Sequence, residues 1–179
     1  IPSLDEIRQK TQRAFGRLPC LWQAKVTRDI LKGDKDVICV APTGLGKTLT
    51  FWMPLLFRPD GIQIVVTPLN ILGTQNQTEL AAQGISAEIE EGKHRVILVN
   101  PEELMKDGGR FEQLWKKPQF TSRIISVVWD EAHCISSWSS FRPEYKETHR
   151  LRYMLPHARF LVASATLADP VKTDVMRIL

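Results

Sequence analysis

The chain has 179 residues, of which 43% are hydrophobic and 25% charged, and its formal net charge is +4. These values are ordinary for one globular domain, and no run of about 18 apolar residues exists that could cross a membrane. The first ten residues are polar and charged, which argues against a secretory signal. Cys20, Cys39 and Cys134 lie too far apart for a disulfide framework or a zinc site. We therefore expect an intracellular protein, nuclear if its source is eukaryotic, whose mild basicity permits nucleic-acid binding without requiring it.

Helical patterns and short apolar runs alternate along the chain. Ser3 and Glu6 form a capping box, which predicts a helix that ends near Phe15, before Gly16 and Pro19. The further predicted elements are, in order, a helix at 21–32, a strand at 36–41, a helix at 47–56, a strand at 62–67, a helix at 71–83, a strand at 94–100, helices at 101–106 and 110–117, strands at 124–130 and 158–166, and a helix at 170–178. This alternation predicts an α/β fold with a mostly parallel sheet covered by helices on both faces. Ligands of such sheets bind beyond the carboxyl ends of the strands.

A glycine-rich segment, APTGLGKT at 41–48, follows the first predicted strand. It matches the phosphate-binding template G-x-x-x-x-G-K-[ST] at seven of eight positions, with Ala41 in place of the first glycine. Backbone N–H groups of such a loop surround phosphates, the lysine reaches the β- and γ-phosphates, and the hydroxyl ligates Mg²⁺. A turn that merely caps a helix would have no need of Lys-Thr. The predicted ATP-binding residues are Thr43, Gly44, Leu45, Gly46, Lys47 and Thr48.

Two acids and a small hydroxyl segment follow the fourth and fifth predicted strands. Asp130 is placed to hold Mg²⁺ together with Thr48, and Glu131 to act as general base toward the attacking water. Alone, the two acids could be a solvated pair at the end of a strand. Ser164 and Thr166, in the segment SAT, could bond to the acids, although by itself this segment is more simply a turn.

An aromatic and basic loop follows the two acids after only a few residues. It contains Trp138, Phe141 and Arg142. Aromatic faces stack on nucleic-acid bases of any sequence, at about 1–3 kcal/mol per base, and arginine adds phosphate or cation–π contacts. Core packing is the alternative for the two aromatic residues. We hypothesise that this loop joins contact with bases to the chemistry of ATP.

The segments APTGLGKT, DEAH and SAT, in this order, resemble the N-terminal RecA-like lobe of superfamily-two helicases. The stretch DEAHCISSWSSFRPEY is similar to that of RecQ-family DNA helicases, in which a DEAH box leads into an aromatic-rich loop and FRPEY. The resemblance extends from about Phe15 to Thr166. It implies one RecA-like domain over residues 1–179, belonging to an ATP-dependent DNA helicase of 3′-to-5′ polarity that acts on single-stranded DNA and duplex junctions. It also implies a second RecA-like lobe elsewhere in the parent chain.

The resemblance also assigns roles to individual residues. Gln23 would read adenine, and His133 would couple the DEAH box to Ser164 and Thr166. The catalytic residues would be Lys47, Asp130, Glu131 and His133. The residues that contact nucleic acid would be Thr67, Pro68, Asn100, Pro101, Trp138, Phe141 and Arg142.

Three features depart from the RecQ pattern and keep alternatives open. Cys20 stands where the family has an arginine, and Pro19-x-x-x-Gln23 is more like the DEAD-box arrangement of RNA helicases. The segments after Gly84 and between Trp138 and Phe141 are shorter than usual. We hypothesise that these are not true deletions, and that flexible loop residues near 88–92 and 138–140 are absent from this sequence. An RNA helicase lobe and a nucleotide-binding scaffold without turnover are therefore the alternatives. Because an arginine from a second lobe is expected to complete the site, we expect this lobe alone to be poorly active.

Overall fold

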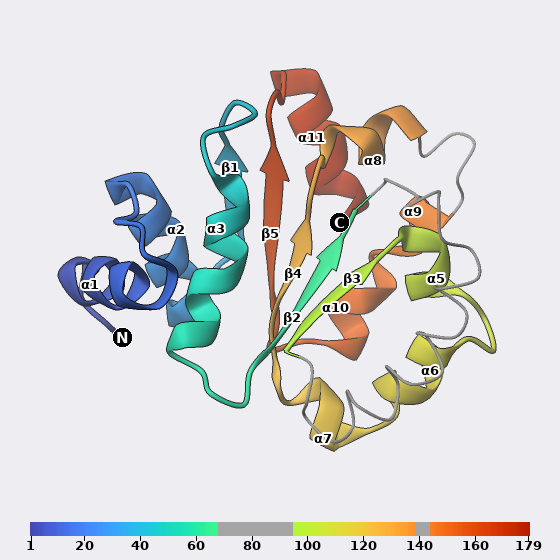
Figure 1. Cartoon of the computed structure of the whole chain (residues 1–179). Coiled ribbons are helices and arrows are strands. Elements are labelled where there is room, and N and C mark those ends of the chain that lie inside the picture. Colours follow the sequence, from blue (N-terminus) through green and yellow to red (C-terminus); the bar gives the residue numbers. More distant parts are fainter. Residues whose placement is uncertain (68–94, 139–143) are drawn as a thin grey trace, which may run out of the picture.

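The computed structural model describes residues 1–67, 95–138 and 144–179. Five parallel strands form one sheet in the order β1-β5-β4-β2-β3 (Figure 1). The strands are β1 (Val37–Val40), β2 (Ile62–Val66), β3 (Val96–Val99), β4 (Ile124–Trp129) and β5 (Arg159–Ser164). The predicted parallel α/β fold is confirmed. The predicted helix at 71–83, the two shortened segments, Pro68, Phe141 and Arg142 lie outside the described residues.

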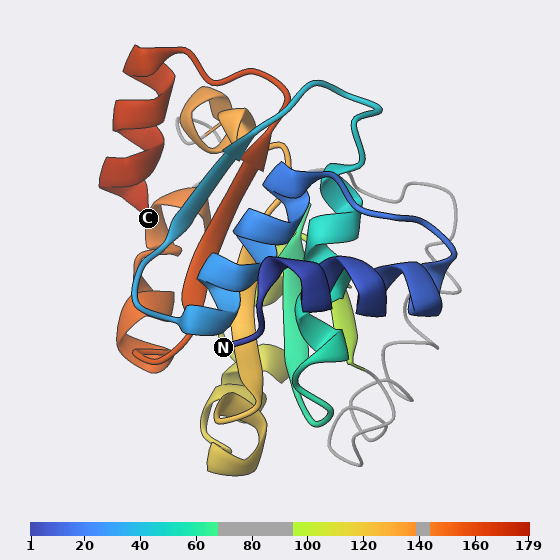
Figure 2. The same ribbon diagram turned by 90° about the vertical axis from the view of Figure 1, so that its left-hand side faces the viewer.

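Helices cover both faces of the sheet, as predicted (Figures 1 and 2). One face is covered by α1 (Leu4–Phe15), α2 (Leu21–Lys32), α3 (Lys47–Trp52) and the 3₁₀ helix η1 (Met53–Leu56). The other helices are α5 (Pro101–Met105), α6 (Arg110–Trp115), α7 (Pro118–Thr121), α8 (His133–Trp138), α9 (Glu144–Glu147), α10 (Arg150–Met154) and α11 (Asp169–Ile178). Among the described residues, no helix is both long and apolar enough to cross a membrane. All three cysteines are free.

The first helix begins and ends where the sequence predicts. The Glu6 N–H donates to Ser3 Oγ (3.2 Å) and the Ser3 N–H donates to Glu6 Oε2 (2.8 Å), which completes the capping box. Gly16 ends the helix in the left-handed region, with φ of 68°. The predicted helix at 47–56 is instead divided into α3 and η1, and Pro54 lies in the second part, where it lacks an N–H for a longer helix.

Four short helices, α7 to α10, were not predicted, and the stretch 133–138, expected as a loop, is helix α8. Each has four to six residues, too few to be stable alone or to show a clear periodic pattern. Packing holds them in place: Ile135 of α8 is 1% exposed and Leu151 of α10 is fully buried.

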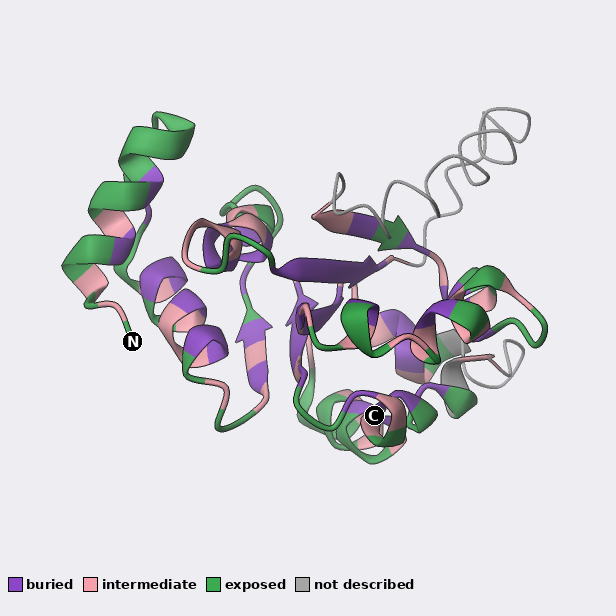
Figure 3. Cartoon of the chain, turned by 90° about the horizontal axis from the view of Figure 1, so that it is seen from below, coloured by how far each residue is buried: buried purple, intermediate pink, exposed green. Residues whose placement is uncertain are grey.

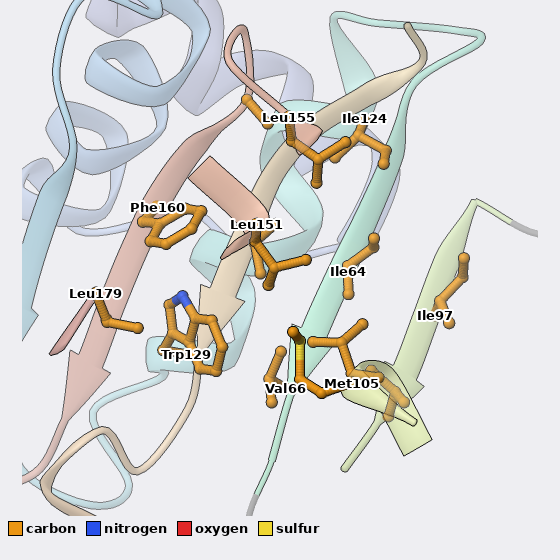
Figure 4. Close-up of a cluster of buried hydrophobic side chains, with 14 of the residues drawn as sticks. Ile64, Val66, Ile97, Met105, Ile124, Trp129, Leu151, Leu155, Phe160 and Leu179 are labelled. Carbon is orange, nitrogen blue, oxygen red and sulfur yellow. The ribbon is translucent and has the colours of Figure 1, made fainter. Parts of the chain in front are cut away.

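Two apolar layers, one on each face of the sheet, form most of the core, and a small third cluster contains Ile7, Ala24 and Met53. Alternate residues of each strand point to opposite faces. In β4 and β5, Trp129 and Phe160 belong to the larger layer, which α10 and α11 complete, whereas Val128 and Leu161 belong to the layer under α2 and α3. Figure 4 shows the larger layer, and Figure 3 shows mostly buried strands between helices whose outer sides are exposed. The core thereby fixes the strands whose carboxyl ends carry the predicted motifs.

Candidate functional site

The motifs predicted from the sequence meet along the carboxyl edge of the sheet, which lies at the top in Figure 1. Because β5 lies between β1 and β4, the segment that begins at Ser164 lies between the glycine-rich loop and the two acids. Backbone hydrogen bonds continue beyond the strand ends: the Ala41 N–H donates to the Ser164 carbonyl (3.1 Å) and the Ala132 N–H to the Ala163 carbonyl (2.9 Å). The three motifs are therefore held side by side by the backbone itself.

The glycine-rich loop has the conformation that a phosphate-binding loop requires. Gly44 and Gly46 have φ of 85° and 80°, in the region that glycine adopts without steric cost. Lys47 is 8% exposed, and its ammonium donates a hydrogen bond to the Ala41 carbonyl (2.7 Å). Ala41 does not have a positive φ, which explains why the first template glycine is dispensable here. Thr43, Leu45 and Thr48 are exposed around this loop.

Gln23 connects helix α2 to the glycine-rich loop. Its side chain is 5% exposed, and its Oε1 accepts a hydrogen bond from the Cys20 N–H (2.7 Å). Its Nε2 donates to the Gly46 carbonyl (2.9 Å). Both ends of the amide thus bond to backbone, and the third position of a helix is where such a glutamine is typical. The contact of Gln23 with adenine stays a prediction, and its role in fixing the loop is one that sequence reasoning missed.

Replacing Gly46 with alanine is expected to lower the free energy of unfolding by about 1–2 kcal/mol, because a side chain at this φ meets the following carbonyl. The added Cβ would also lie 2.9 Å from Gln23 Nε2, so the side-chain amide of Gln23 must move away from the glycine-rich loop. We therefore expect weaker nucleotide binding as well, measured by thermal denaturation and by titration with a fluorescent nucleotide. Gly16→Ala is the matched control, since Gly16 has φ of 68° with nothing within 4 Å of its Cβ. Equal nucleotide binding by both variants would contradict the role of the Gln23 contact.

Asp130 and Glu131 occupy the end of β4 in distinct environments. The Asp130 N–H donates to the Val66 carbonyl (2.9 Å), and the Asp130 Oδ1 accepts from the Glu131 N–H (3.0 Å). Burial raises the pKa of the Asp130 carboxyl, and the nearby charge of Glu131 adds to this, against the opposing charge of Lys47. Glu131 has φ of 50°, the one positive φ among the described residues that are not glycine. Such backbone strain is concentrated at functional sites.

His133 joins the acids to the SAT segment through one chain of contacts. Its Nδ1 lies 3.0 Å from Ser164 Oγ and 3.5 Å from Glu131 Oε2. The Ser164 hydroxyl donates its only hydrogen to the Thr166 carbonyl (2.7 Å), so Ser164 must accept from a protonated Nδ1 of His133. In neutral His133, the Nε2 lone pair then faces Cys134 Sγ at 3.6 Å, a neighbour that sequence reasoning did not identify. This geometry provides the contacts that the predicted coupling of His133 to Ser164 and Thr166 requires.

Replacing Asp130 with asparagine is expected to stabilise the chain at neutral pH. Because the folded-state pKa of Asp130 lies above its ordinary value of 3.8, ionisation opposes folding at every pH above both values. The advantage of asparagine should therefore be full at pH 7 and shrink as the pH falls through the raised pKa toward 3.8. Thermal denaturation of both proteins between pH 7 and pH 4 measures it. A variant that is less stable than the native chain at pH 7, or a difference that grows in acid, would contradict the role of burial.

The remaining predicted residues lie along the same edge of the sheet. The Thr67 N–H donates to the Val99 carbonyl (3.0 Å), which places Thr67 beside Asn100 at the ends of β2 and β3. The Asn100 Oδ1 caps α5 by accepting from the Glu103 N–H (2.7 Å), and Pro101 is the buried first residue of that helix. Trp138 is the last residue of α8. The nucleic-acid contacts predicted for these residues stay predictions.

The donors at this edge fit ATP with Mg²⁺. The backbone amides of the exposed loop, the lysine ammonium and the start of a helix can donate hydrogen bonds to phosphates. Thr48 and Asp130 offer the hard oxygen ligands that Mg²⁺ prefers. Within the described ranges, no group of three or more His, Cys, Asp or Glu side chains could hold a metal ion. Mg²⁺ does not need one, because it commonly binds through one or two protein ligands together with water and substrate phosphates.

Comparison with solved structures shows the same fold. The DUF1998 helicase MrfA bound to DNA matches 100% of this chain with a TM-score of 0.67 and 17% identity. The same helicase bound to DNA and AMPPNP matches with a TM-score of 0.65 and 16% identity. This chain covers 29% and 28% of those two chains, respectively.

Sequence relatives, at higher sequence identity than the solved structures, and a family model also indicate a helicase domain. The chain is 31% identical over 191 residues to the rat ATP-dependent DNA helicase Q5, covering 94% of this chain and 19% of the relative. It is 31% identical over 173 residues to the ATP-dependent DNA helicase RecQ of Haemophilus influenzae, covering 87% and 27%. The resemblance to RecQ-type helicases is thereby confirmed, and the chain spans about a fifth to a quarter of the length of these relatives. The family model for the DEAD/DEAH box helicases matches residues 21–173, and the chain belongs to this family.

Proposed function

We propose that this chain is the first ATP-binding lobe of a RecQ-type, ATP-dependent DNA helicase that unwinds duplexes with 3′-to-5′ polarity. The observation that supports it most is the contact between Glu131, His133 and Ser164, which connects the acids to the segment beside the glycine-rich loop. Contacts of this kind let the state of the nucleotide alter the position of neighbouring segments. A motor needs such a connection, whereas a nucleotide-binding scaffold does not.

In this proposal each residue acts on the bound nucleotide in a defined way. Lys47 offsets phosphate charge, and the amides of Gly44 and Gly46 surround the phosphates. Thr48 and Asp130 would hold Mg²⁺, which neutralises charge on the phosphates when it is bound. The Glu131 carboxylate accepts a proton from the attacking water. His133 Nδ1, 3.5 Å from Glu131 Oε2, helps to orient that carboxylate.

DNA is the proposed track. The relatives are named as DNA helicases, and the solved neighbours are bound to DNA. Single-stranded DNA would contact Thr67, Pro68, Asn100 and Pro101, and bases would stack on Trp138 and Phe141 beside Arg142. A second RecA-like lobe in the parent chain would supply the arginine that completes the site, so this lobe alone is expected to be poorly active. Such a protein would work inside the cell, on single strands and duplex junctions.

Two alternatives have weaker support. Pro19-x-x-x-Gln23 is the one feature that favours an RNA helicase, and none of the relatives named above is one. A scaffold without turnover would have no need of Lys47 and the two acids together. Both alternatives predict a different response to nucleic acid.

The test is ATP hydrolysis by the parent protein without nucleic acid, with single-stranded DNA and with single-stranded RNA, using Glu131→Gln as the blank. Strong stimulation by DNA alone, lost in the blank, is the expected result. Equal or greater stimulation by RNA would assign the protein to the RNA helicases. Absence of turnover in all three conditions would leave the scaffold and overturn the role of Glu131.

A further inference from the structure

Helix α8 is held in place by helix α11. The two helices lie side by side near the carboxyl edge of the sheet, from which α11 runs back along the sheet (Figure 1), and they are in extensive contact. Ile135 of α8 and Val175 of α11, 1% and 0% exposed, belong to the same apolar cluster. Because a six-residue helix is not stable alone, the position of α8 depends on such contacts.

A polar contact adds a second attachment between the two helices. The Ser136 hydroxyl of α8 donates a hydrogen bond to the Asp174 carboxylate of α11. The Arg177 guanidinium, one turn further along α11, lies 2.5 Å from Asp174 Oδ1 and orients that carboxylate. These two hydrogen bonds lower the pKa of Asp174, so it is charged at neutral pH. Hydrogen bonds to charged acceptors are about twice as strong as neutral ones.

Besides the apolar contact with α11, helix α8 has two polar contacts with the same stretch of chain. At its first residue, His133 contacts Ser164, whose hydroxyl donates to the Thr166 carbonyl. Helix α11 begins shortly afterwards at Asp169, and its Asp174 accepts the hydrogen bond from Ser136 of α8. A displacement of the SAT segment reaches α8 directly and through α11. The two polar contacts restrict the rotation of this short helix more closely than the apolar contact does, because hydrogen bonds are directional.

We propose that Asp174 is a positioning residue that couples contact with single-stranded DNA to ATP hydrolysis. Trp138, predicted to stack on bases, is the last residue of α8, two positions after Ser136. The described contacts of Asp174 involve Ser136 and Arg177, not Lys47, Asp130 or Glu131, so it acts on the site through α8. This inference rests on the proposed function, because it requires hydrolysis that DNA stimulates.

The experiment compares native parent protein with Asp174→Ala, Ser136→Ala and the double variant. Basal ATP hydrolysis should be unchanged, whereas the DNA-stimulated rate should fall by about 2- to 30-fold, the range of mutations that weaken coupling. The double variant should lose no more than the single variants, since both remove the same hydrogen bond. Asp174→Asn, which keeps an acceptor oxygen, should recover part of the stimulated rate.

Arg177→Ala is the matched control, since Arg177 is 79% exposed and its removal leaves the bond between Ser136 and Asp174 in place. It should retain most of the stimulation. If DNA stimulates ATP hydrolysis by the native protein and stimulates the Asp174→Ala and Ser136→Ala variants equally, this inference is overturned but the proposed function is not. Additive losses in the double variant do the same. A native protein without DNA stimulation overturns the proposed function and this inference with it. If Asp174→Ala does not fold, the milder Ser136→Ala and Asp174→Asn variants decide.

Discussion

Replacing Glu131 with glutamine is expected to lower DNA-stimulated ATP hydrolysis by about 10²- to 10⁴-fold, the contribution typical of a general base. Glutamine has nearly the same shape but cannot accept the proton of the attacking water. Glutamine can adopt the same backbone φ of 50° at position 131, and its side chain can still approach His133. The conformation of the site should therefore be unchanged. Nucleotide binding, measured by titration with a fluorescent analogue, should therefore change little.

Glu103→Gln is the matched control, because it makes the same chemical change on an exposed carboxylate of α5 whose partner, Lys106, is also exposed. Its hydrolysis rate should equal that of the native protein. A Glu131→Gln variant that hydrolyses ATP at the native rate would remove Glu131 from the chemistry. A variant that loses nucleotide binding as well would show that Glu131 has a structural role in the loop.

Replacing Trp129 with alanine is expected to cost about 3–5 kcal/mol of unfolding free energy, the range for removing a large aromatic side chain from a core. Trp129 is 1% exposed, and its ring centroid lies 5.8 Å from that of Phe160 at an interplanar angle of 60° (Figure 4). The guanidinium of Arg152 lies 3.9 Å from the centroid of the same Phe160 ring. Phe160 therefore packs against both Trp129 and Arg152. A domain has only about 5–15 kcal/mol of stability, so this loss is a large part of the total.

Urea denaturation of the chain measures this loss. Tyr153→Ala is the control, because Tyr153 is 83% exposed and its removal should change stability by less than about 0.5 kcal/mol. Trp129→Phe should lose less than alanine, since it keeps a ring and removes an indole N–H that has no hydrogen-bond partner among the described residues. A loss below about 1 kcal/mol in Trp129→Ala would show that the core closes around the gap.

Local patterns in the sequence were sufficient to predict the sheet class, and they named the chemical groups that the structure brings to one edge of the sheet. Apolar runs of six to nine residues between helices predicted parallel strands, and the structure has strands of four to six residues at these places. The glycines before Lys47 predicted a phosphate-binding loop, and the positive φ of Gly44 and Gly46 agrees with such a loop. These features depend on residues close together in the chain. The short helices escaped prediction because they depend on residues far apart in the chain: α8 is held by contacts with α11, some 35 residues further along the sequence.

The sequence by itself determined which residues we propose for the chemistry: a lysine and glycines after the first strand, two acids after the fourth, and small hydroxyl residues after the fifth. Only the tertiary structure decided their arrangement. The strand order β1-β5-β4 places Ser164 between the loop and the acids and within 3.0 Å of His133, and folding brings the Gln23 amide to Gly46. Strand order depends on the packing of whole helices and strands against one another. That energy is summed over contacts between residues far apart in the chain, and no local pattern reports it.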